Sequence, residues 1–142
     1  MKRTAGSLAI FALATFSVCA ALTDGKTKTP DVSKLIPPSN MPGLTYEKDI
    51  KPIVEASCFK CHGVEKPKGR FRLDSRDTMI KGGESEQAAI VPGQSAKSPL
   101  IWYVSDLVEE MEMPPLDKRD KNTPLTKEQI AILRAWIDQG AK

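Results

Sequence analysis

The clearest pattern of apolar and polar positions lies at the C-terminal end of the chain. One apolar face with helical spacing is formed by Ile130, Leu133, Trp136 and Ile137. Thr126 and Gln129 stand at the N-cap and N3 positions of a capping box, and Gly140 stands where a helix usually ends in glycine. The pattern predicts a helix over residues 127–139.

A second apolar face precedes the middle of the chain. Ile50, Ile53 and Val54 recur at intervals of three and four residues. Pro52 is compatible with a helix only in the first turn, whose N–H groups have no partner within the helix. We therefore expect a helix over residues 49–57, with Asp49 as its N-cap.

Two further segments favour short helices. Residues 98–110 have an apolar period that extends to Val108, with Ser98 as the expected N-cap and Pro99 at the first helical position. Residues 74–83 predict a short helix that ends at Gly82. The predicted fold class is therefore mostly α, with three to four short helices and irregular connections rich in Pro and Gly.

The N-terminal segment has a different character. Lys2 and Arg3 precede an apolar stretch that ends in small residues, which predicts a secretory signal over residues 1–20. The alternatives are an uncleaved membrane anchor and a lipoprotein signal at Cys19. A periplasmic or otherwise exported protein follows from any of the three.

Residues 21–43 are rich in Pro, Ser, Thr, Asp and Lys and show no apolar period. We expect a flexible tether there, with an ordered arm anchored by Leu35 and Ile36 as the alternative. The folded domain is expected over residues 44–142.

Composition narrows the function classes. The chain has 142 residues and a formal net charge of +3, with no basic run interleaved with aromatic residues, which argues against nucleic-acid binding. Only 6% of the residues are aromatic, so short helices alone would give a thin core. A buried cofactor would help to fill it.

The scarcest residues lie together. Cys58, Cys61 and His62 form a Cys-x-x-Cys-His motif that contains the only histidine of the chain, and cleavage after residue 20 would leave these two cysteines alone. The motif is the signature of covalent haem attachment, with the thiols one helical turn apart and the histidine directed at the iron. The alternatives are a redox dithiol, which requires a βαβ context, and a zinc site, which requires four ligands.

A single histidine leaves the opposite face of a haem iron to another donor. Met113 stands before Pro114 and Pro115, which stiffen the chain and keep Met113 out of the α region. We expect Met113 to be the distal ligand, with Met111 in reserve. The alternative for Met113 is a gap-filling apolar residue.

The motifs together resemble the class I cytochrome c fold, and most closely the planctomycete-type cytochrome c domain. The resemblance is carried, in order along the chain, by residues 46–63, 68–83, 90–104, 113–126 and 129–142. It implies one covalent haem c, thioether bonds from Cys58 and Cys61, iron ligation by His62 and Met113, and a crossing of helices 49–57 and 127–139 beside the haem.

The expected function is single-electron transfer between exported redox partners whose identity the sequence does not give. The alternative is a catalytic or sensory haem protein with an open distal site. Arg70 and Arg72 are candidate partners of the haem propionates. Residues 60–72 carry a net charge of +4 and residues 106–120 a net charge of −4, so a basic loop beside His62 could steer an acidic partner.

Overall fold

A computed structural model describes residues 30–142. The predicted signal at residues 1–20 and the start of the predicted tether, residues 21–29, lie outside the described residues. The α-helices are α1 (Lys51–Ser57), α2 (Phe59–His62), α3 (Arg76–Lys81), α4 (Pro99–Val104) and α5 (Lys127–Asp138). This part of the chain contains no strand, so the predicted, mostly α fold class is confirmed. None of its helices is long and apolar enough to cross a membrane.

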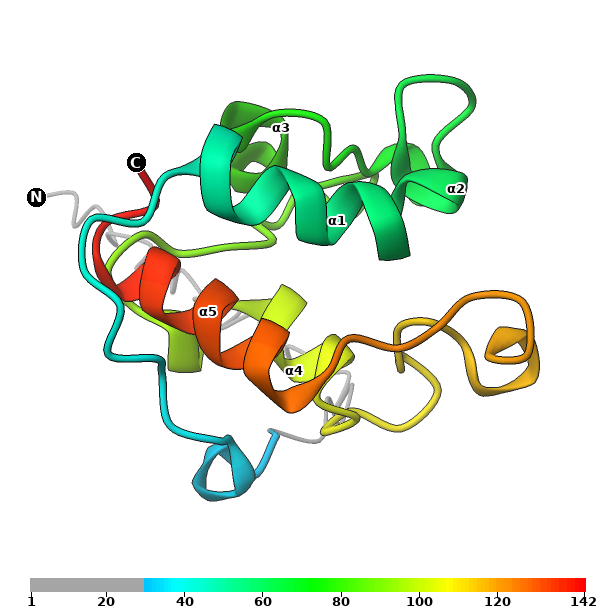
Figure 1. The fold of residues 1–142 in the computed structure, drawn as a ribbon. Coiled ribbons are helices and arrows are strands. Elements are labelled where there is room, and N and C mark those ends of the chain that lie inside the picture. The colour runs from blue at the N-terminus through cyan, green and yellow to red at the C-terminus, as the bar shows by residue number, and fades with distance from the viewer. Residues whose placement is uncertain (1–29) are drawn as a thin grey trace, which may run out of the picture.

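The helices form two groups. In Figure 1, α1, α2 and α3 lie on one side of the domain, and α4 and α5 lie on the other. Single turns interrupt the connections at η1 (Val32–Lys34), η3 (Lys68–Arg70), η4 (Ser95–Lys97) and η5 (Leu116–Lys118). Between α4 and α5 runs a long segment without an α-helix, residues 105–125, which we call the 105–125 loop.

The N-terminal helix begins earlier than the sequence predicts. A π-helical turn, η2 (Tyr46–Ile50), continues directly into α1, and its N-cap is Thr45. The expected N-cap role of Asp49 is therefore wrong: its carboxylate accepts a hydrogen bond from the Thr45 N–H at 2.8 Å, from inside the first turn. The earlier start is favoured because it buries Tyr46 and Ile50.

The C-terminal helix α5 follows the sequence prediction closely. The Gln129 N–H donates to Thr126 Oγ1 at 3.2 Å, and the Thr126 N–H donates to Gln129 Oε1 at 2.9 Å, which completes the capping box. Trp136 is fully buried, and its ring lies 6.1 Å from the ring of Tyr46. The expected contact between the first and last helices is thus made at η2.

Helix α4 is shorter than its apolar period. It ends at Val104, and Asp106 has a positive φ of 55°, which an α-helix does not accommodate. Ser98 is not a side-chain cap, because its hydroxyl accepts from the Val91 N–H at 2.9 Å and donates to the Gln94 carbonyl at 3.1 Å. These bonds hold the preceding loop against the start of α4.

The described part of the predicted tether lies on the domain. The Ser39 N–H donates to the Ala131 carbonyl at 2.9 Å, and Gln139 Nε2 donates to the Met41 carbonyl at 2.7 Å. The Arg134 guanidinium donates to the Ile36 carbonyl. From residue 36 to residue 41 the chain is therefore an arm along α5, the alternative to a flexible tether, because polar side chains of α5 bind its backbone carbonyls.

Candidate cofactor site

A cavity of about 670 Å³ opens between the two groups of helices. Its wall comes from α2, from residues 68–73 and 83–89, from α4 and from the 105–125 loop. The volume is within the range of pockets that enclose a cofactor or a small ligand. Cys58, Cys61, His62 and Met113, the predicted site residues, all line it.

The Cys-x-x-Cys-His motif is a single tight turn. The Cys58 carbonyl accepts from the Cys61 N–H at 3.0 Å and from the His62 N–H at 2.9 Å. The Cys58 N–H is itself bound to the Val54 carbonyl of α1 at 2.8 Å. The turn therefore continues the N-terminal helix, and α1 fixes where both thiols meet the cavity.

His62 is held in one tautomer. Its Nδ1 lies 3.1 Å from the Phe71 carbonyl, an acceptor, so Nδ1 carries the proton and Nε2 keeps its lone pair. The Phe71 ring contacts the imidazole edge-on, with 5.3 Å between ring centres. Burial lowers the pKa of His62 and so favours the neutral ring. A neutral imidazole with an available Nε2 is the form that binds iron.

The thiols lack the features of a reactive redox pair. Both are free, and burial, with a smaller contribution from Cys61, raises the pKa of Cys58 to about 11. A nucleophilic dithiol requires a lowered thiol pKa, commonly at the N-terminus of a helix in a βαβ unit. Here the motif follows an α-helix, and the described residues contain no strand. The redox-dithiol alternative is therefore not favoured.

Two methionines line the cavity. Met113 is partly buried against the core, whereas Met111 is 42% exposed. Met79 is fully buried in α3 within the core, and Met41 lies on the arm. The two methionines that the sequence proposed as candidates for the distal position are thus the ones that the fold brings to the cavity.

These residues fit a haem c. The thiols of Cys58 and Cys61 and the imidazole of His62 lie on one side of the cavity, and the thioether of Met113 comes from the 105–125 loop. Most of the remaining lining is apolar. In residues 30–142, no three His, Cys, Asp or Glu side chains gather in a way that could hold a metal ion, as the zinc alternative would require.

The charged residues at the cavity differ from those expected. Arg72 is paired with Asp74 through two hydrogen bonds of 2.7 and 2.6 Å, and the Arg70 side chain is 85% exposed. Neither lines the cavity. The positively charged residues that do so are Lys60, Lys68, Lys118 and Lys121.

Two features of the site were not predicted from the sequence: the lysines of the 105–125 loop at the cavity and the backbone partner of His62. Lys118 and Lys121 belong to a segment whose net charge is negative, which concealed that its lysines face the cavity. The Phe71 carbonyl is a backbone group, so no residue type could have indicated its bond to His62.

Part of the chain matches a known protein family. Residues 58–117, which begin at the first cysteine of the motif and include Met113, match the family model described as Planctomycete cytochrome C. No curated protein and no solved structure matches the chain.

Proposed function

We propose that this chain is a mono-haem c-type cytochrome that transfers single electrons between exported redox proteins, and the match of residues 58–117 to the Planctomycete cytochrome C family model supports the proposal. One observation carries the proposal: Cys58, Cys61, His62 and Met113 meet at a single cavity, although 51 positions separate the histidine from the methionine. The domain that holds them is proposed to extend over residues 44–142.

Each residue has a distinct role in the proposal. Cys58 and Cys61 bind the haem covalently, His62 Nε2 is the proximal ligand, and Met113 is the distal ligand. When bound, the haem supplies one-electron chemistry, with the iron alternating between ferric and ferrous states. The chain excludes water through the apolar wall, and the Met113 thioether favours the ferrous state, which raises the reduction potential.

The residues on the distal side, opposite His62, favour an electron carrier over an enzyme. A peroxidase-like site usually needs an acid–base residue opposite the proximal histidine, and the only histidine of the chain is already bound to Phe71. The partly buried Met113 offers a ligand and no proton.

The test begins with protein made together with a haem c maturation system. Haem that resists acid–acetone extraction and an intact mass raised by one haem are expected, and the same mass reports whether residues 1–20 have been removed. Absence of covalent haem would end the proposal.

The distal ligand has a separate test. Met113→Ala should abolish the far-red thioether band of the ferric spectrum, because the iron loses its sulfur ligand. Met111→Ala is the matched control and should retain the band. The opposite result would transfer the ligand role to Met111, and a band that neither substitution affects would assign the sulfur ligand to another methionine. Absence of the band from the unmodified protein would favour an open or differently ligated distal side.

A further inference from the structure

We propose that Arg119 is a positioning residue for Met113, acting together with Asp106 to fix the 105–125 loop against the end of α4. The inference rests on the proposed function, because it concerns how the distal ligand is held. It is carried by three hydrogen bonds of one guanidinium group.

The guanidinium joins distant parts of the loop. Its two terminal nitrogens donate to the Asp106 carboxylate, Nη2 to Oδ1 at 2.6 Å and Nη1 to Oδ2 at 3.0 Å. Its Nε donates to the Pro114 carbonyl at 3.1 Å. Asp106 lies two residues beyond α4, and Pro114 directly follows Met113. Arg119 therefore connects the start of the loop to the backbone beside the ligand.

A second bond holds the other side of Met113. The Met113 N–H donates to the Tyr103 carbonyl at 2.9 Å, and Tyr103 belongs to α4, whose neighbouring Leu100 and Ile101 are buried in the core. The Met113–Pro114 unit is thus bound at its first N–H and at its last carbonyl. The first bond attaches this unit directly to α4, and the second attaches it through Arg119 to Asp106, just beyond the C-terminal end of α4.

Packing contributes less to this loop than to the helices. Leu116 is 61% exposed and Met111 is 42% exposed, and most residues from 105 to 121 are exposed or only partly buried. Polar contacts must therefore supply much of the restraint. An Arg–Asp pair with two parallel bonds gives directional restraint that a single lysine charge does not.

The restraint on Met113 should affect ligation of ferric iron more than ligation of ferrous iron. A thioether is a soft, neutral ligand that favours ferrous over ferric iron. Ligation of the ferric state therefore depends more on the methionine being held in place beforehand, because an unrestrained loop loses conformational entropy on binding. Loosening the loop should weaken ferric ligation while ferrous ligation persists.

The effect should be local. The Asp106 side chain is 46% exposed, and exposed ion pairs contribute little to overall stability. A change in ferric ligation without a comparable change in unfolding would therefore separate positioning from a general structural role.

The experiment uses the holoprotein and follows the ferric far-red thioether band as the pH is raised. Arg119→Gln and Asp106→Asn should each weaken ferric methionine ligation about tenfold, which lowers the pH midpoint for loss of the band by about one unit. Arg119→Lys should lower it as far as Arg119→Gln, because lysine keeps the charge but cannot reproduce the three bonds. The double variant should add little, because the two side chains act as one unit.

The matched control is Glu47→Gln, which removes an exposed carboxylate paired with Lys51 at 2.9 Å in the N-terminal helix. Its pH midpoint should equal that of the unmodified protein, and the urea midpoints of all variants should lie close together. If Arg119→Gln and Asp106→Asn behave like the control while Met113→Ala abolishes the band, the positioning inference is wrong and the proposed function stands. Full rescue by Arg119→Lys would also overturn it. Absence of covalent haem would overturn both proposals together. A band that survives Met113→Ala would overturn the positioning inference and the assignment of Met113 as the distal ligand, while the proposal of a c-type cytochrome would stand.

Discussion

The Phe71 carbonyl is the contact on which the orientation of His62 depends. Its oxygen lies 3.1 Å from His62 Nδ1, and the Phe71 ring also contacts the imidazole. Gly83 lies close behind Phe71 and leaves no room for a side chain. A Cβ atom at Gly83 would lie 2.4 Å from the Gly69 carbonyl oxygen and 2.9 Å from Phe71 Cβ.

Gly83→Ala should therefore displace Phe71 and disturb His62. We expect overpacking to lower the free energy of unfolding of the holoprotein by about 1–3 kcal/mol. The His62 Nδ1–H resonance in the NMR spectrum of the ferrous protein should shift or broaden, because its hydrogen bond lengthens.

Gly93→Ala provides the control for backbone strain. Gly93 has a φ of 81°, and a Cβ atom there would meet nothing within 4 Å. It should lower stability by about 1–2 kcal/mol through its left-handed backbone while the His62 resonance stays in place. An unchanged resonance in Gly83→Ala would contradict the link from Gly83 to His62.

At the scale of elements, α5 supports both ends of the domain. It binds the arm through Arg134 and through its C-cap residue Gln139, and it contacts η2 through Trp136. Its length and start follow from local signals, the capping box and the apolar period. Loss of the cap should therefore weaken the whole domain and not only one turn.

Thr126→Ala should lower the free energy of unfolding by about 1 kcal/mol, because the Gln129 N–H loses its side-chain acceptor. Urea unfolding of the holoprotein measures the change. Thr123→Ala, at an exposed position shortly before the helix, is the matched control and should change stability by less than about 0.5 kcal/mol. Equal effects of the two substitutions would show that the capping box contributes nothing measurable.

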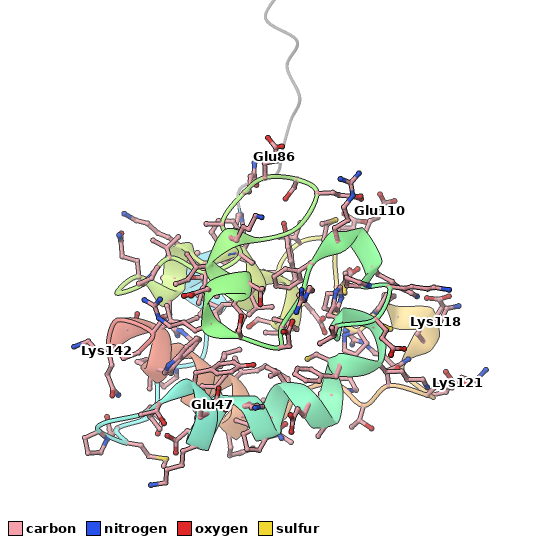
Figure 2. All side chains as sticks on the ribbon, turned by 90° about the horizontal axis from the view of Figure 1, so that it is seen from above. Glu47, Glu86, Glu110, Lys118, Lys121 and Lys142 are labelled. Atoms are coloured by element: carbon pink, nitrogen blue, oxygen red, sulfur yellow. The ribbon has the colours of Figure 1, made fainter. Side chains whose placement is uncertain are left out.

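At the scale of the whole molecule, positive charge gathers around the cavity, although the net charge of the chain is only +3. The lysines come from two parts of the chain. Lys60 and Lys68 lie in and just after the Cys-x-x-Cys-His motif, and Lys118 and Lys121 lie in the 105–125 loop. Figure 2 shows Lys118 and Lys121 extending outward at the end of the domain opposite Lys142. None of the acidic residues of 106–120 lines the cavity, although Asp117 is paired with Lys118 at 2.5 Å. Glu84 is the one acidic residue among the described lining residues, against four lysines.

We therefore propose that the redox partner is acidic where it meets this end. The rate of electron exchange with an anionic metal complex should fall as ionic strength rises. Lys121→Glu should lower that rate about two- to fourfold at low salt, because it replaces attraction with repulsion near the cavity.

Lys142→Glu makes the same change in net charge at the opposite end of the molecule and should leave the rate nearly unchanged. Equal losses in the two variants would mean that only the overall charge acts. A rate independent of ionic strength would contradict the docking proposal itself.

The sequence alone was enough to predict several features because they depend on neighbours along the chain. The capping box and apolar face of α5 and the short helix before Gly82 are examples. The Cys-x-x-Cys-His motif, whose three residues lie within one turn, belongs to the same class. Met113 was proposed through the resemblance and the two following prolines; it lines the cavity, and its ligand role stays a proposal.

Tertiary structure decided what depends on residues far apart in sequence. The early end of α4 accompanies a loop in which Arg119 binds Asp106 and Pro114, and no local pattern carries that information. The arm was expected to be flexible because its own residues show no apolar period. Arg134 of α5 and the C-cap residue Gln139 nevertheless bind its carbonyls. The carbonyl that orients His62 was likewise not predictable, because a backbone acceptor is the same in every residue and its partner is set by the fold. The same holds for the lysines that line the cavity, because only the folded chain decides which surface charges lie beside it.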